Sequence, residues 1–162
     1  MKKKRSINAK VLKDLGLEPP TRVVRKQKPS PYHKPGTDSR HLDEVYEALK
    51  KILVRHEKKF KVKGWQYEVD EQVYPSYYLH IPSQADRPEI PFLGVAKNRS
   101  YITFHLHVLM DEKFAKLLSK QLELHRHGQT VLNFTEIDRP LFKQLAKLTA
   151  DLVRMAEDGG YI

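Results

Sequence analysis

The sequence has no cysteine and no long apolar run. With 0 cysteines in 162 residues, it excludes disulfide bridges, thiolate nucleophiles and zinc or iron–sulfur sites built on cysteine. The longest nearly apolar run, from Ile90 to Ala96, is interrupted by Pro91 and Gly94, whereas a membrane-spanning helix needs about 20 mostly apolar residues. No apolar segment of a secretory signal follows the basic start of the chain. We therefore expect a cytoplasmic protein that does not cross a membrane.

Familiar catalytic motifs are absent as well. The segment over residues 56–60 reads His-Glu-Lys-Lys-Phe and lacks the second histidine of a zinc-protease helix. The sequence also contains no glycine-rich phosphate-binding loop and no nucleophile elbow. We therefore expect a protein without enzymatic activity and without a cofactor, unless a metal ion such as iron or zinc binds to its histidines.

Positive charge is concentrated at the N-terminal end. The whole chain carries a formal net charge of +10, and residues 1–40 contain 12 of its 30 Lys and Arg residues but 3 of its 20 Asp and Glu residues. These 40 residues are also rich in proline and poor in large apolar side chains, a composition typical of disordered chains. We therefore divide the sequence into a basic, largely disordered arm over 1–40 and one folded domain over 41–162.

The basic arm is the candidate for contact with nucleic acid or with an acidic partner. Clustered Lys and Arg side chains bind phosphates by releasing condensed counterions. Two alternatives remain at this point: a tail that only increases solubility, and a short nuclear import signal at the start of the chain. The nucleic-acid candidates are Lys2, Lys3, Lys4, Arg5, Arg22, Arg25, Lys26 and Lys28.

Hydrophobic periodicity over residues 41–162 predicts an α+β fold. Apolar residues at helical spacing predict a first helix over 41–60 and a last helix from Asp138 to Met155. A short helix is expected after Asp111. The predicted strands, rich in β-branched and aromatic residues, are Val62–Val69, Tyr74–Ile81, Phe92–Lys97, Ser100–Leu109 and Gln129–Phe134. This order predicts an antiparallel sheet of about five strands with the two long helices packed on one face.

The predicted strand over 100–109 has a clear alternation of apolar and polar residues. Successive side chains of a strand point to opposite faces of the sheet. We expect one set to be buried beneath the last helix and the other set to lie on the opposite face. The buried set is Ile102, Phe104, Leu106 and Val108, and the opposite set is Tyr101, Thr103, His105 and His107.

Three segments of this domain resemble the YdhG-like family of uncharacterised bacterial domains. They are the hairpin GVAKNRSYITFHL over residues 94–106, the tyrosine-rich SYYL over 76–79 and the strand GQTVLNF over 128–134. The resemblance extends over roughly residues 41–162 and includes the closing helix. It implies a compact frataxin-like sandwich of helices and sheet, and, because relatives are described as iron chaperones, it also implies a role in iron delivery.

Histidines supply the candidate metal ligands. His105 and His107 are two positions apart on one predicted strand, so both imidazoles are expected on the same face, where two neutral imidazoles can share a transition-metal ion. His80, on a neighbouring predicted strand, is the candidate third ligand. The alternative is that these histidines are ordinary polar residues on the solvated face of the sheet.

Aromatic and cationic side chains form the candidate ligand-binding surface. Exposed aromatic rings can stack on bases, and Lys or Arg side chains can hold phosphates. The same residues could instead bind a small anion or pack under the loop over 82–91. The candidates are Tyr77, Tyr78, Lys97, Arg99 and Tyr101. The predicted function is the binding of a small ligand or of an unknown partner on the sheet face, with metal delivery and nucleic-acid association through the arm as alternatives.

Overall fold

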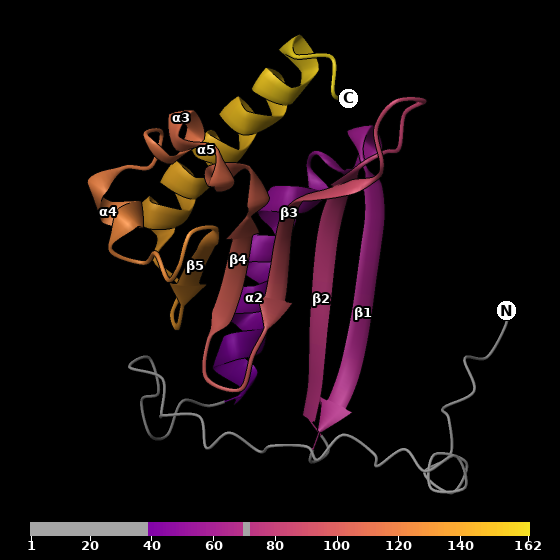
Figure 1. The fold of residues 1–162 in the computed structure, drawn as a ribbon. Helices are drawn as coiled ribbons and strands as arrows, with labels where there is room; N and C mark the ends of the chain where they lie inside the picture. Colours follow the sequence, from indigo (N-terminus) through magenta and orange to yellow (C-terminus); the bar gives the residue numbers. More distant parts are fainter. Residues whose placement is uncertain (1–38, 70–71) are drawn as a thin grey trace, which may run out of the picture.

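Two long helices cover one face of a five-stranded sheet. The computed structural model describes residues 39–69 and 72–162, so residues 1–38 of the predicted basic arm lie outside the described residues. The five strands are antiparallel neighbours in the order in which they occur in the sequence. Helices α2 (Ser39–Val54) and α5 (Arg139–Asp158) lie together behind the sheet in Figure 1, and the fold is therefore the predicted α+β architecture.

The element bounds follow the predicted order along the chain. The helices are α2 (Ser39–Val54), α3 (Glu112–Ala115), α4 (Lys120–Glu123) and α5 (Arg139–Asp158), with 3-10 turns η1 (Glu57–Lys59) and η2 (His107–Met110). The strands are β1 (Lys61–Val69), β2 (Gln72–Ile81), β3 (Ile90–Lys97), β4 (Ile102–Leu106) and β5 (Val131–Phe134). Within the described ranges, no helix is both long enough and apolar enough to cross a membrane.

Helix α5 has its cap and its apolar stripe where the sequence places them. The Asp138 carboxylate accepts a hydrogen bond from the backbone N–H of Leu141 at 2.9 Å, and Pro140 lies in the first turn, where its missing N–H costs no hydrogen bond. The buried residues recur at helical spacing: Leu141, Phe142, Leu145, Leu148, Thr149, Leu152, Val153 and Ala156. One face of α5 therefore packs on the sheet while the other faces solvent.

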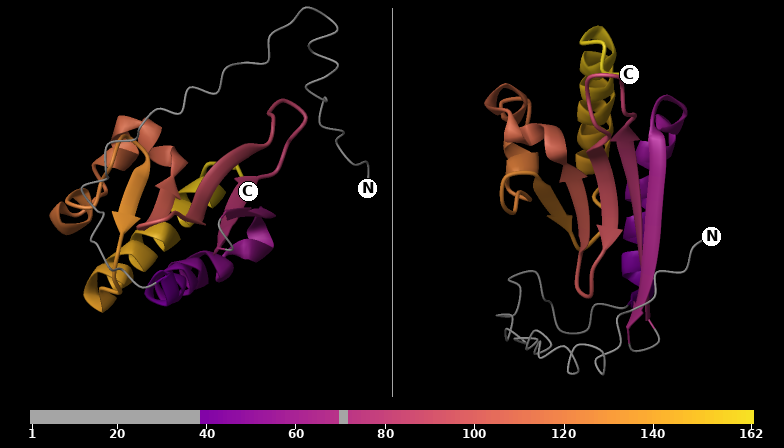
Figure 2. Two further views of the ribbon diagram at one scale, coloured as in Figure 1. Left: turned by 90° about the horizontal axis from the view of Figure 1, so that it is seen from below. Right: turned by 45° about the vertical axis from the view of Figure 1, so that its right-hand side comes forward.

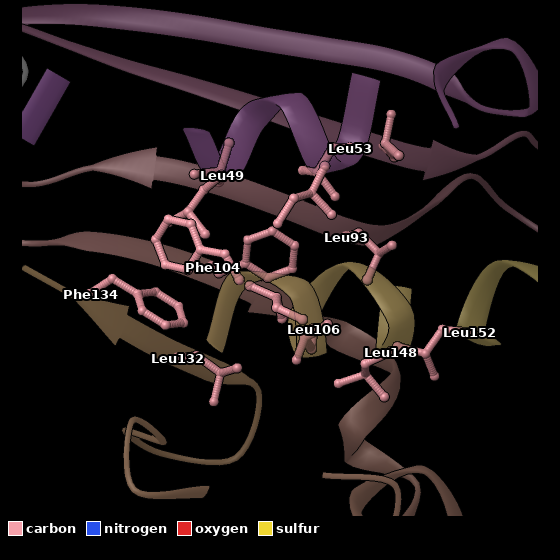
Figure 3. Packing of buried hydrophobic residues seen from close by; sticks show 14 of the residues in the cluster. Leu49, Leu53, Leu93, Phe104, Leu106, Leu132, Phe134, Leu148 and Leu152 are labelled. Carbon is pink, nitrogen blue, oxygen red and sulfur yellow. The ribbon is translucent and has the colours of Figure 1, made fainter. Parts of the chain in front are cut away.

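The core lies between the two helices and the sheet (Figure 3). Ile102, Phe104 and Leu106 of β4 are completely buried and belong to the same cluster as Leu145 and Leu148 of α5. The predicted alternation of β4 is thus confirmed for these three residues. Val108, which was expected to continue it, belongs to η2 and is half-buried against the core.

A β-bulge in β3 brings two successive residues into the core. Leu79 pairs with Leu93 and His80 pairs with Pro91, so Phe92 is an extra residue between the two pairs. Both Phe92 and Leu93 are buried. The bulge also resets the alternation of β3, because an extra residue shifts the side chains that follow it to the other face.

The first helix and the fourth strand are shorter than predicted. Helix α2 ends at Val54 instead of residue 60, because Phe60 is buried by stacking on Phe92 of β3 at a ring-centroid distance of 5.3 Å. Strand β4 ends at Leu106, so His107 starts η2 rather than continuing the strand. Strand β5 begins at Val131, which pairs with His105, and the Leu106 N–H donates to the Thr130 carbonyl oxygen at 2.7 Å just beyond this pair.

Candidate functional site

The open face of the sheet, the one opposite α2 and α5, carries the candidate site (Figures 1 and 2). Residues that pair across antiparallel strands share a face. The pairings therefore place Pro91, Gly94 and Ala96 of β3 on the open face, beside His80 and Tyr78 of β2. The central strand thus contributes small side chains between two strands with large ones, and these large side chains can approach each other above it.

Four rings form an aromatic row across this face: Trp65, Tyr78, His105 and His107. Trp65 stacks on Tyr78 with ring centroids 4.9 Å apart and planes at 7°. The Tyr78 ring lies 5.3 Å from His105, which stacks on His107 at 5.6 Å and 12°. Trp65 is 54% exposed and Tyr78 is 8% exposed, so Trp65 offers the accessible end of the row.

Gly94 makes room for the row. A Cβ atom at this position would lie 2.2 Å from Cδ1 of Tyr78, far inside van der Waals contact. The Tyr78 ring therefore lies above the backbone of β3 and is enclosed between its neighbours. This burial raises the pKa of the Tyr78 phenol to about 12, so the hydroxyl is neutral at physiological pH.

Glu89 organises the basic end of the open face. Its carboxylate accepts a hydrogen bond from the Lys61 ammonium at 2.7 Å and pairs with Lys63, and these two contacts lower the pKa of Glu89 to about 2. Nδ1 of His80 lies 3.0 Å from the same carboxylate. An ionised carboxylate only accepts hydrogen bonds, so we assign the proton of His80 to Nδ1 and the lone pair to Nε2.

The histidines of this face are neutral at physiological pH. Burial and the neighbouring His107 lower the pKa of His105 to about 4. Burial also lowers the pKa of His107, with a further contribution from His80, and that of His80, where Lys63 adds to the effect and Glu89 opposes it. Neutral imidazoles keep a lone pair that can accept a hydrogen bond or bind a metal ion.

The structure divides the predicted ligand-binding residues between the two faces. Tyr78 lies on the open face, whereas Tyr77, its neighbour in the strand, points towards the helices and its hydroxyl donates to Oε2 of Glu57 at 2.8 Å. Lys97 also lies on the helix side, where it is 5% exposed and its ammonium is 2.6 Å from Oδ1 of Asp43. Tyr77 and Lys97 therefore do not share a surface with Tyr78.

The remaining ligand candidates lie in a turn. Arg99 and Tyr101 belong to the connection between β3 and β4, which is closed by a hydrogen bond from the Asn98 N–H to the Tyr101 carbonyl oxygen at 2.9 Å. Arg99 and Tyr101 thus lie at one end of the sheet. In the same turn, Asn98 Nδ2 donates a hydrogen bond to the Thr103 hydroxyl at 2.7 Å. The five predicted ligand-binding residues therefore lie in three separate places and do not form one surface.

The predicted metal ligands lie closer together. His80, His105 and His107 all border Tyr78, with ring centroids 6.4, 5.3 and 6.2 Å from its ring. In the part of the chain that the structure describes, no three side chains of the types that ligate metals are grouped tightly enough to hold an ion together. The open face thus places these three histidines around one tyrosine without forming a closed three-ligand site.

A groove of about 770 Å³ separates the outer surfaces of α2 and α5. Its walls include Ala48, Ile52 and Phe142, and charged residues of both signs border it. Asp43, one of the bordering acids, is already paired with Lys97. The groove is distinct from the open face, and none of the predicted site residues lines it. Its one link to them is Asp43, through the ion pair with Lys97.

Trp65 and Glu89 belong to the site but are not among the residues predicted from the sequence. Lys61, Lys63 and Trp65 alternate along β1 and so share a face, and that spacing was the available signal for Trp65. Glu89 lies in the connection between β2 and β3. Its contacts with β1 depend on how that loop returns to the sheet, for which the sequence offers no local pattern.

Comparison with known proteins gives no relative for this arrangement. No family model, no curated protein and no solved structure matches the chain. Membership of the YdhG-like family therefore stays a prediction. The nucleic-acid candidates between Lys2 and Lys28 lie outside the described residues, so contact through the arm stays a prediction as well.

Proposed function

We propose that this protein is a non-enzymatic binding protein whose open face takes up a small ligand with a flat ring, which stacks on Trp65. The observation that carries the proposal is the exposed Trp65 ring, held parallel to Tyr78 on a face that no described helix covers. Tyr78 supports the indole from one side, so its other parts remain accessible. Stacking of a base on such an aromatic side chain contributes about 1–3 kcal/mol.

The charges beside Trp65 favour a ligand that also carries an anionic group. Lys61 and Lys63 alternate with Trp65 on β1 and keep 58% and 45% of their side chains exposed. Both ammonium groups contact Glu89, so one carboxylate is shared between two cations and the local charge is positive. A nucleotide, with a planar base and a phosphate, combines the two features in one small molecule.

The single tryptophan of the chain makes the test direct. Because the sequence contains 1 Trp, its fluorescence reports on Trp65 alone. Titration of the full-length protein with AMP is expected to quench this emission in a saturable manner, with weaker saturation by adenosine or by inorganic phosphate alone. No saturable change with any of the three probes would contradict the proposal.

Calorimetry with matched variants separates stacking from a general effect of aromatic residues. Trp65→Leu is expected to weaken AMP binding by about 5- to 150-fold, the equivalent of the stacking energy above. Tyr161→Leu is the control, because Tyr161 is also an exposed aromatic residue but lies near the C-terminus. Equal affinities of the two variants would show that Trp65 is not the contact.

Iron delivery, the alternative that the resemblance implies, is not supported by carboxylates of α2. Asp43 is paired with Lys97 at 2.6 Å, and Glu47 lies 3.7 Å from Lys50. Hard cations prefer several oxygen ligands free of competing cations. Iron-chaperone activity, nucleic-acid binding through the arm and a cytoplasmic location therefore stay predictions beside the ligand-binding proposal.

A further inference from the structure

Two imidazole nitrogens on the open face are buried without a partner. Nε2 of His80 and Nε2 of His107 are shielded from solvent and make no hydrogen bond with any group in the described ranges. Buried polar atoms are nearly always satisfied, and one that is not points to a bound water, an ion or a functional role. Two such atoms of one chemical type on one face call for a common explanation.

The strand between them allows the two side chains to converge. His80 belongs to β2 and pairs with Pro91 of β3, while His107 directly follows β4 on the other side of β3. Strands two positions apart in a sheet are separated by about 9–10 Å, a span that two imidazole side chains can bridge when the strand between them carries no large side chain. Pro91, which lies opposite His80, satisfies this condition, whereas the space over Gly94 is filled by the Tyr78 ring.

One contact of His80 is typical of a metal ligand. Its Nδ1 is held by the Glu89 carboxylate at 3.0 Å, which directs the lone pair of Nε2 away from Glu89. A carboxylate that accepts the other ring N–H is the usual outer-shell partner of a metal-bound histidine, because it fixes the tautomer and increases the basicity of the ligating nitrogen.

We propose that His80 and His107 bind a divalent transition-metal ion of the zinc class through their Nε2 atoms, with Glu89 as the outer-shell partner of His80. Imidazole is a favoured ligand of such ions, and the site needs no deprotonated thiol. Water completes the coordination, since no third ligating side chain is grouped with the pair in the described residues.

The metal ligands of this site are distinct from the Trp65 stacking contact, and the two sites share only Glu89, which also pairs with Lys61 and Lys63. Tyr78 lies between them, 4.9 Å from Trp65 and 6.2 Å from His107 by ring centroids. Loss of the indole is therefore expected to leave metal binding intact. The two proposals can fail independently, and one substitution distinguishes them.

Calorimetric titration of the full-length protein with Zn²⁺ tests the proposal. We expect one ion per chain at this site. Glu89→Gln is expected to weaken binding by about 10- to 100-fold, as loss of an outer-shell partner does, and His80→Ala and His107→Ala by at least as much. His127→Ala is the matched control, because His127 is exposed in the connection before β5, and together with Trp65→Leu it should leave the affinity unchanged within about twofold.

A second measurement avoids substitutions that could disturb the fold. Long-range ¹H–¹⁵N spectra of the wild-type imidazoles, recorded with and without Zn²⁺, should show the Nε2 resonances of His80 and His107 moving together at one equivalent. Movement of other histidines instead, or equal affinity in His80→Ala, His107→Ala and the wild type, would overturn the proposal. Absence of Zn²⁺ binding would overturn it as well.

Discussion

The two faces of the sheet differ in what they bury and in what they expose. On the face covered by helices, β4 contributes Ile102, Phe104 and Leu106, all fully buried in an apolar cluster. On the open face, the same strand contributes Thr103 and His105, and His105 joins a row of rings that ends in an exposed tryptophan. Because strand side chains alternate, the same strand packs into the core on one face and contributes to the candidate site on the other.

Phe104→Ala should have the largest effect on stability. Phe104 is completely buried beneath the helices, and truncation of a core phenylalanine costs about 3–5 kcal/mol in transfer energy and cavity formation. Urea denaturation followed by circular dichroism measures the loss. A decrease in the free energy of unfolding below about 1 kcal/mol would mean that the helix-covered face is not where the fold gains its stability.

Gly94→Ala should disturb the open face specifically. The new Cβ would overlap the Tyr78 ring, and such overpacking costs about 1–3 kcal/mol. Ligand binding at Trp65 should weaken at the same time, because Trp65 stacks on the displaced ring.

A double-mutant cycle assigns the cause. If the Tyr78 ring is the obstacle, Gly94→Ala in a Tyr78→Ala background should cost less than in the wild type by about 0.5 kcal/mol or more. Equal costs in the two backgrounds would place the strain in the backbone of β3 instead. Denaturant melts of the four proteins provide the comparison.

Substitutions at Lys97 and Asp43 test whether the buried Lys97 ammonium is tolerated on the helix-covered side because Asp43 neutralises it. Its ammonium is buried beside Asp43 at 2.6 Å and lies 5.9 Å from the centre of the Tyr74 ring. Asp43→Ala should cost about 1–3 kcal/mol, since it leaves a buried cation without its carboxylate. Lys97→Met, an apolar replacement of similar length, should change stability by less than about 1.5 kcal/mol and leave AMP binding unaffected.

A double variant shows whether Asp43 stabilises the protein through Lys97 or independently of it. In the Lys97→Met background, Asp43→Ala should cost under about 0.5 kcal/mol, as expected for a surface position. A cost as large as in the wild type would show that Asp43 stabilises α2 independently of Lys97. Thermal and urea denaturation of the three variants measure these differences.

The helix-covered face could be predicted from the sequence because its signal is local. The period of two in β4 and the apolar stripe of α5 both depend on residues a few positions apart, and Ile102, Phe104 and Leu148 are buried as expected. The predicted end of α2 was wrong because Phe60 stacks on Phe92 instead of continuing the helix. That contact joins residues 32 positions apart and leaves no trace in the spacing around Phe60.

The open face was harder to predict because it depends on register. His80, His105 and His107 do border one ring, Tyr78, but Tyr77 and Tyr78 were grouped although neighbours in a strand face opposite ways. The place of Trp65 beside Tyr78 follows from the pairing of β1 with β2, in which Trp65 lies opposite Ser76. A side chain's neighbours across a sheet are fixed by pairing, which the spacing within each strand does not determine.

His105→Ala should have a small effect on stability and is the most direct test of the difference between the two faces. His105 follows Phe104 directly but lies on the other face, where its loss removes ring contacts with Tyr78 and His107. Contacts between rings contribute about 0.5–1.5 kcal/mol, and some of this is regained because the buried imidazole no longer has to be desolvated. We therefore expect a decrease of about 0.5–1 kcal/mol in urea denaturation, several times less than for Phe104→Ala. A larger loss of unfolding free energy for His105→Ala than for Phe104→Ala would show that the two residues lie on the opposite faces from those described, with the register of β4 shifted by one.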